Sequence, residues 1–152
     1  MELNNKNEIR SIQTRDYHKN YVGLLNQLSE TSFTCDQFEN FIRNRNKNKN
    51  NIIIKVIEKN NKIIATGTLV IENKLIHYIS KAGHIEDIII DKDYRGMGYG
   101  LKMISHLINL GKEVGCYKVI LNCKDELVGF YDKCSLQRKG SQMIKYFDLV
   151  NN

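Results

Sequence analysis

The sequence predicts a protein of the α/β (α+β) class, in which helices pack on a mixed β-sheet. Two observations predict this. Segments with the two-residue period of strands alternate along the chain with segments that have the spacing of amphipathic helices. The chain of 152 residues is long enough for one substantial core and too short for two. We therefore expect a single domain over residues 1–152, with a core at about 8–149.

The first half of the chain is predicted to hold two helices and three strands. In order, these are a strand at 8–12, a helix capped by Thr14, a helix that opens at 34–37, and strands at 51–59 and 62–72. The helix after Thr14 is predicted from the apolar stripe of Tyr21, Leu24, Leu25 and Leu28.

Local side chains indicate where these elements begin and turn. Thr34 and Gln37 have the spacing of a capping box, which satisfies the first free N–H groups of a helix. The pair Asn60-Asn61 can adopt positive φ and therefore predicts a tight hairpin between the two strands. Residues 43–51 (RNRNKNKNN) have the low complexity of a solvated connector.

The second half is predicted to hold four strands and two helices. In order, these are strands at 74–81 and 83–90, a glycine loop at 91–100 with its helix, a strand at 116–123, a short helix at 126–134 and a closing strand at 141–149. The long helix is predicted from the spacing of Leu101, Ile104, Leu107 and Ile108, and Gly115 is typical of its C-terminal end.

Charge and cysteine content restrict the class of partner. The net charge is +6, but many of the lysines alternate with asparagine and lack the aromatic residues that stack on bases, so we expect no nucleic acid. The basic excess suits a small phosphorylated ligand. The four cysteines have no zinc-site spacing, so we expect reduced, core-packed thiols and no metal. No apolar leader or membrane-length run is present, which predicts a soluble, cytoplasmic protein.

The glycine loop contains an arginine and three glycines at alternate positions, R95-G96-M97-G98-Y99-G100. Its register excludes both the dinucleotide fingerprint and the P-loop, because Leu101 stands where each needs a glycine. A bare loop at a helix N-terminus lets successive N–H groups point at an anion, and the helix dipole adds to the attraction. The loop therefore predicts a site for a pyrophosphate.

Two carboxylates, Glu86 and Asp87, interrupt an otherwise apolar strand. Adjacent residues of a regular strand point to opposite faces, so the two are not expected to serve one face. A charged pair inside a central strand is costly without partners, and at least one should contact a ligand or a structural cation.

The glycine loop matches the [RQ]-x-x-G-x-[GA] motif of the GCN5-related N-acetyltransferase (GNAT) fold. Spaced segments also resemble those of the glucosamine 6-phosphate N-acetyltransferases, over about residues 8–147: LSETSFTCDQF, IENKLIH, GHIEDI, GCYKVIL and VGFYDKC. The resemblance implies a mostly antiparallel sheet with splayed central strands and a homodimer. It further implies direct transfer, in a ternary complex, of the acetyl group of acetyl-CoA to the amine of D-glucosamine 6-phosphate, on the route to UDP-N-acetylglucosamine.

The resemblance also implies roles for individual residues. The implied cofactor-binding residues are Ile88, Ile89, Ile90, Arg95, Gly96, Met97, Gly98, Tyr99, Gly100, Leu101, Tyr131 and Lys133. The implied substrate-binding residues are Thr31, Lys74, His77, Glu86, Asp87, Ile88, Tyr117 and Lys118. The implied catalytic residues are Tyr131, which faces the departing thiolate, and Asp87 with Glu86, which bind or deprotonate the ammonium.

Other interpretations stay open. Phe130 and Tyr131 could be an aromatic core pair, and Lys74 and His77 could be solvated or structural residues. Asn122 stands where the family usually has an acidic residue, and an amide cannot act as a base. The rival functions are a GNAT enzyme for a protein or polyamine, and a catalytically silent sensor that binds acyl-CoA.

Overall fold

A computed structural model describes residues 9–45, 47 and 51–148. Contacts within the chain divide it into two compact units, residues 1–121 and 122–152. Parts of three predicted segments, namely Glu8, residues 46 and 48–50, and Leu149, lie outside the described residues.

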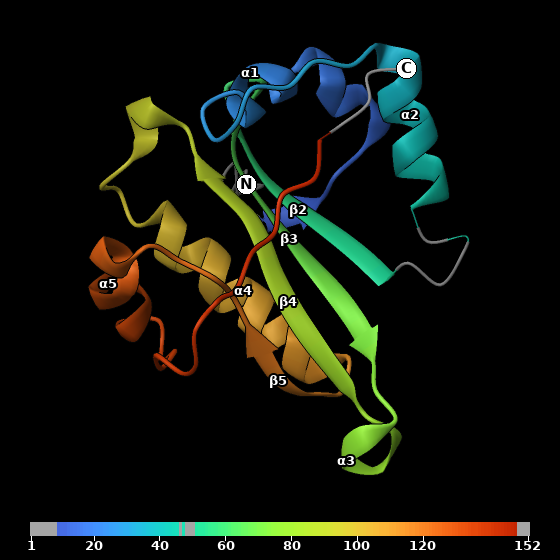
Figure 1. Cartoon of the computed structure of the whole chain (residues 1–152). Coiled ribbons are helices and arrows are strands. Elements are labelled where there is room, and N and C mark those ends of the chain that lie inside the picture. The colour runs from blue at the N-terminus through green and yellow to red at the C-terminus, as the bar shows by residue number, and fades with distance from the viewer. Residues whose placement is uncertain (1–8, 46, 48–50, 149–152) are drawn as a thin grey trace, which may run out of the picture. The chain divides into compact units, whose positions relative to one another are not determined.

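The first unit contains a five-stranded sheet whose strands follow the order of the chain (Figure 1). The strands are β1 (Ile9–Ser11), β2 (Asn51–Lys59), β3 (Lys62–Asn73), β4 (Lys81–Ile90) and β5 (Cys116–Ile120). The pairs from β1 to β4 are antiparallel, and β5 runs parallel to β4. The predicted mixed, mostly antiparallel sheet flanked by helices is confirmed.

Helices cover both faces of this sheet. The helix α4 (Tyr99–Glu113) packs on one face of β3, β4 and β5 through Met103, Ile104 and Leu107, which are fully buried. Leu101, which was predicted to belong to this buried stripe, is 42% exposed because it lies on the first turn, beyond the packed face. The helices α1 (Tyr21–Leu25) and α2 (Cys35–Asn44) share a second apolar cluster with the other face of the sheet.

Local capping explains the N-terminal helices. The capping box at Thr34 and Gln37 is confirmed and opens α2. The single helix predicted from Thr14 is wrong. Gln13 instead caps a short 3₁₀ turn, η1 (Thr14–His18), and Asn20, with φ of 60°, separates η1 from α1. A left-handed residue cannot continue a right-handed helix.

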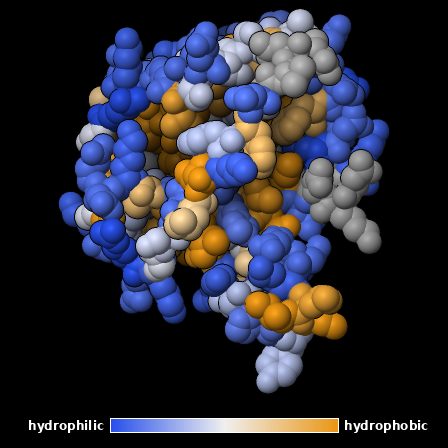
Figure 2. All heavy atoms as spheres, in the orientation of Figure 1, coloured by the Kyte–Doolittle hydropathy of each residue, from blue (hydrophilic) through white to orange (hydrophobic). Residues whose placement is uncertain are grey.

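The two tight connections of the sheet differ from one another. Asn60 and Asn61 adopt positive φ, as predicted for a hairpin between β2 and β3. The predicted strand at 74–81 is wrong, because the chain reverses there through the short turn α3 (Ile76–Ile79). This turn forms an apolar tip, Leu75–Ile79, whose large side chains are mostly exposed (Figure 2). Among the residues that the structure describes, none pairs with Leu75–Ile79 in a β-ladder.

The second unit contains the 3₁₀ turn η3 (Asp125–Leu127) and the helix α5 (Val128–Asp132), which confirm the predicted short helix. An ion pair of 3.1 Å between Arg138 and Asp125 joins a later segment to η3. The predicted closing strand is wrong for residues 141–148, which form no ladder in the described chain and expose their large apolar side chains. No helix in the described parts of the chain has the length and apolar character that a membrane span requires.

Candidate functional site

A β-bulge brings the two carboxylates of β4 to the same face of the sheet. Thr66 of β3 lies opposite Ile89, whereas Thr68 lies opposite Glu86, so Gly67 faces two residues of β4. The extra residue is Asp87, whose φ of 50° is left-handed. The prediction that Glu86 and Asp87 face opposite sides is therefore wrong, because the bulge interrupts the alternation.

Gly67 makes room for this bulge. A Cβ atom at Gly67 would lie 2.6 Å from Cδ1 of Ile88 and 3.0 Å from side-chain atoms of Leu107 and Met103. Ile88 therefore points towards α4, and Asp87 points to the opposite face. Sequence reasoning missed Gly67, although a glycine between β-branched residues is a signal for a bulge.

The carboxylates of Glu86 and Asp87 line a cavity of about 570 Å³ between the sheet and the helices α1 and α2. Apart from Glu86 and Asp87, most of its lining is apolar or aromatic, including Phe33, Phe38 and Phe41. Tyr21 also lines it and forms a hydroxyl hydrogen bond of 3.1 Å with Thr66. Burial raises the pKa of Tyr21 to about 12. Such a cavity can hold a small organic ligand and orient it by one charged corner.

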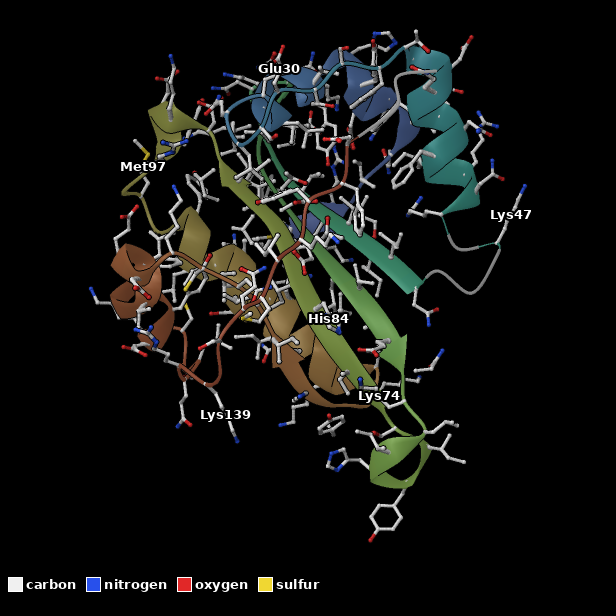
Figure 3. All side chains as sticks on the ribbon, in the orientation of Figure 1. Glu30, Lys47, Lys74, His84, Met97 and Lys139 are labelled. Carbon is white, nitrogen blue, oxygen red and sulfur yellow. The ribbon has the colours of Figure 1, made fainter. Side chains whose placement is uncertain are left out.

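A cluster of three hydrogen-bonded side chains, Glu72, Lys74 and His84, lies farther along the same face. Lys74 Nζ is 2.8 Å from Glu72 Oε1, and His84 Nε2 is 2.8 Å from Glu72 Oε2 (Figure 3). The hydrogen bond with Glu72 raises the pKa of Lys74, and those from Lys74 and then His84 lower the pKa of Glu72. Sequence reasoning found Lys74 but missed Glu72 and His84, because only the strand register brings the three together.

The other predicted substrate residues of the first unit lie in two places. His77 belongs to the apolar tip, and its ring lies 4.3 Å from that of Tyr117, centroid to centroid. Lys118 lies over the Tyr117 ring and pairs across the sheet with Ala82 of β4. Thr31 lies in the loop before α2, where Asn26 forms hydrogen bonds with its N–H and carbonyl groups.

The pairing of β4 with β5 ends before the bulge. Within the described residues, the ladder runs from Lys81 to His84 of β4, whereas β4 itself continues to Ile90. One backbone edge of Ile88–Ile90 is therefore not paired with β5. This arrangement agrees with the splayed strands expected from the resemblance, and it leaves N–H and C=O groups for an extended ligand.

The glycine loop has a backbone that suits an anion. Gly96 and Gly98 have φ of 76° and 86°, and no atom lies within 4 Å of the position of a Cβ at either residue. Gly98 begins α4, whose N-terminus has no side-chain cap and no acidic residue in its first turn. The free N–H groups of that turn fit a pyrophosphate. Gly100 lies inside the helix, and the neighbouring Met97 is 63% exposed.

Two contacts fix the start of this loop. Arg95 Nε donates a 3.0 Å hydrogen bond to the carbonyl of Ile90. Asp91 is buried and forms a 2.7 Å ion pair with Lys62 of β3. Burial alone would raise the pKa of Asp91, but hydrogen bonds from Lys62 and the backbone N–H of Asp93 lower it. These contacts of Arg95 and Asp91 hold the start of the loop against the ends of β3 and β4.

The second unit carries Tyr131, Lys133 and Asn122. The Tyr131 ring lies 5.0 Å from that of Phe130 in an edge-to-face arrangement. Burial, followed by the nearby thiols of Cys123 and Cys134, raises the pKa of the Tyr131 hydroxyl. A phenol with a raised pKa keeps its proton at neutral pH, so its O–H remains available as a hydrogen-bond donor to an anionic sulfur. Of the four cysteines, which were predicted to be core residues, Cys134 is buried but Cys123 is exposed, so the prediction is wrong for Cys123.

The chain is similar to proteins of known activity over most of its length. The model of the acetyltransferase (GNAT) family matches residues 7–135. A glucosamine 6-phosphate N-acetyltransferase of Dictyostelium discoideum is 42% identical, with 90% of this chain and 88% of that protein covered. The crystal structure of the Arabidopsis thaliana glucosamine-6-phosphate N-acetyltransferase superposes with a TM-score of 0.89 at 40% identity, covering 93% of this chain and 98% of that one. The chain therefore belongs to the acetyltransferase (GNAT) family.

Proposed function

We propose that this protein transfers the acetyl group of acetyl-CoA to the amine of D-glucosamine 6-phosphate. The products are N-acetyl-D-glucosamine 6-phosphate and CoA, which places the reaction on the route to UDP-N-acetylglucosamine. The observation that carries the proposal is the order of charges along one sheet face, with Glu86 and Asp87 at the cavity and Lys74 farther out. An amino sugar phosphate has the complementary order, a cationic amine and an anionic phosphate. Relatives of that name at 40% to 42% identity support it.

The chain's own residues supply each step of a direct transfer. The Asp87 carboxylate, with Glu86 beside it, binds the ammonium and takes one of its protons, directly or through water, so that the neutral amine can attack. The N-terminus of α4 and the glycine loop hold the pyrophosphate, and Ile88–Ile90 pair with the pantetheine arm. The Tyr131 hydroxyl gives its proton to the departing thiolate, and it regains a proton from the nitrogen, which loses its second proton as the amide forms. Lys74, His77, Lys118 and Thr31 orient the sugar phosphate.

The proposal includes a cytoplasmic homodimer. Large apolar side chains that a single chain exposes favour association. In the first unit, Leu75 and Ile79 of the apolar tip are 88% and 81% exposed, and in the second, Met143 and Phe147 are 91% and 76% exposed. The four free cysteines agree with a reducing compartment. Light scattering after size exclusion tests the dimer, and a monomeric mass would contradict it.

A steady-state assay with a panel of amines tests the activity. The panel contains glucosamine 6-phosphate, glucosamine, a polyamine and a lysine peptide, each with saturating acetyl-CoA. We expect kcat/KM to be highest for glucosamine 6-phosphate, because the phosphate adds charge-assisted hydrogen bonds. Equal values for glucosamine and its 6-phosphate would contradict the phosphate site. A preference for the polyamine or the peptide would assign the protein to another substrate class.

A further inference from the structure

The Glu72 carboxylate is shared between the Lys74 ammonium and the His84 imidazole. One oxygen accepts from Lys74 Nζ and the other from His84 Nε2, each at 2.8 Å. A neutral imidazole can donate from Nε2 to a carboxylate and still accept a second proton on Nδ1. The three side chains therefore have a net charge of zero when His84 is neutral and of +1 when it is protonated. Lys74, the predicted ligand of the phosphate, is already neutralised by Glu72 in the first state.

The strand register identifies the other charged groups on this face. Ala82 of β4 pairs with Glu72 of β3 on one side and with Lys118 of β5 on the other. Residues directly opposite one another share a face, so Lys118 lies on the same face of the sheet as Glu72. Glu86 lies two residues beyond His84 on the same face of β4, about 6.6 Å along the strand. The β5 residue opposite His84 is the apolar Ile120, which carries no charge. After the hydrogen bond with Glu72, the nearby Tyr117 contributes to the raised pKa of Lys74.

We propose that His84 is a positioning residue that couples its own protonation to binding of the substrate's phosphate. Protonated His84 balances the charge of Glu72, and Lys74 is then left to the dianionic phosphate. The inference rests on the proposed function, because it needs an anionic substrate next to Lys74. Linkage is reciprocal, so a bound phosphate also favours the protonated form of His84.

The size of the effect follows from charge and distance. One added positive charge about 8 Å from a dianion strengthens binding roughly 3- to 10-fold when the effective dielectric between them is close to that of water, as for these partly exposed side chains. An imidazole changes its charge between about pH 5 and 8, so the effect falls within the range of an ordinary assay. A merely structural link between β3 and β4 would change stability but would not produce this pH dependence.

The test compares His84→Gln with the parent protein. Glutamine can still donate to Glu72 but cannot be protonated. The KM for glucosamine 6-phosphate is measured from about pH 5.5 to 8.5, and the variant's value is divided by the parent's at each pH. Titration of the substrate's own amine and phosphate cancels in this ratio. We expect the ratio to rise from about one at the alkaline end to roughly 3 to 10 at the acidic end, with a flat ratio for acetyl-CoA.

Controls separate the two proposals and guard against a folding defect. With unphosphorylated glucosamine the ratio should stay flat, and a rise there would overturn the inference. A flat ratio with the 6-phosphate would overturn it as well, whereas a parent protein without preference for the phosphorylated sugar would overturn the proposed function. Glu72→Gln, which keeps the side-chain shape, should lower the KM for the 6-phosphate at the alkaline end. A higher KM would mean that Glu72 orients Lys74, and it would overturn the inference too.

Discussion

Asp87 lies on the same face of the sheet as its neighbour Glu86, because β4 bulges at Asp87 opposite Gly67. The bulge gives one corner of an apolar cavity two carboxylates from consecutive positions. The bulge also reverses the face of the sheet to which each later residue of β4 points. Ile88 therefore packs towards α4, and Ile89 belongs to the apolar cluster with α1 and α2. One backbone irregularity therefore determines both the candidate base and the core contacts beyond it.

Gly67→Ala should damage this arrangement. The new Cβ would lie 2.6 Å from Cδ1 of Ile88 and 3.0 Å from side-chain atoms of Leu107 and Met103, so the Ile88 side chain must move in a crowded space and strain the bulge. Overpacking of this kind destabilises by about 1 to 3 kcal/mol, measured by chemical denaturation. The kcat should also fall, because Asp87 and Glu86 move.

Gly83→Ala is the matched control for Gly67→Ala. A Cβ at Gly83 would lie 2.9 Å from Leu69 and 3.0 Å from Val119, also in the core but away from the bulge. We expect a similar loss of stability and a much smaller change in kcat. Equal losses of kcat in both variants would contradict a specific role for the bulge.

The two carboxylates can be separated by isosteric substitution. Asn tolerates the left-handed conformation of residue 87, so Asp87→Asn should keep the bulge and remove only the base. We expect kcat/KM for the amino sugar to fall roughly 10²- to 10⁴-fold, with unfolding free energy changed by less than about 1 kcal/mol. Glu86→Gln should have the smaller effect. The reverse order would make Glu86 the base.

The sequence predicted those elements whose cause is local. The capping box of Thr34 and Gln37 and the turn of Asn60-Asn61 depend on side chains that act on their own backbone, and both are confirmed. The long apolar strands β2 and β3 were found for the same reason.

The errors arose where the cause is distant in the sequence. The alternating patterns of residues 74–81 and 141–149 are typical of strands, but a strand exists only with a neighbour to pair with, and periodicity does not identify one. The bulge needs Gly67 of β3 to lie beside Ile88 of β4 and beside Met103 and Leu107 of α4, and these three elements are far apart in the sequence. The association of Glu72 with Lys74 and His84 likewise depends on the register of β3 with β4.

The glycine loop can be tested with a pair of equivalent substitutions. Gly98 and Gly115 both have φ of 86° with open space around a new Cβ, one before α4 and the other after it. Alanine at either position should cost about 1 to 2 kcal/mol of stability through the left-handed backbone. Only Gly98→Ala should raise the KM for acetyl-CoA, by roughly tenfold, because it alone disturbs the N–H groups that face the pyrophosphate. Unchanged thermal protection of that variant by CoA would contradict the loop assignment.

The role of Tyr131 depends on its hydroxyl proton. Tyr131→Phe keeps the contact with Phe130, so acetyl-CoA affinity and melting temperature should change little while kcat falls roughly 10²- to 10⁴-fold. Because burial raises the pKa of Tyr131, the parent should keep its acid form, and this contribution to kcat, beyond about pH 10. A melting temperature that falls in step with activity would instead support a structural aromatic pair.

The phosphate site makes the most selective prediction. Lys74→Ala should raise the KM for glucosamine 6-phosphate roughly 10- to 150-fold, the range for one charge-assisted contact, and leave the KM for acetyl-CoA unchanged. The low rate with unphosphorylated glucosamine should also stay the same, because that substrate lacks the anionic phosphate that Lys74 would bind. Lys47 is exposed in the loop after α2, so Lys47→Ala serves as the control: it removes one positive charge away from the proposed phosphate site. Equal losses with both sugars would mean that Lys74 and Glu72 hold the end of β3 rather than the phosphate, and no loss with either would leave anion binding to His77 and Lys118.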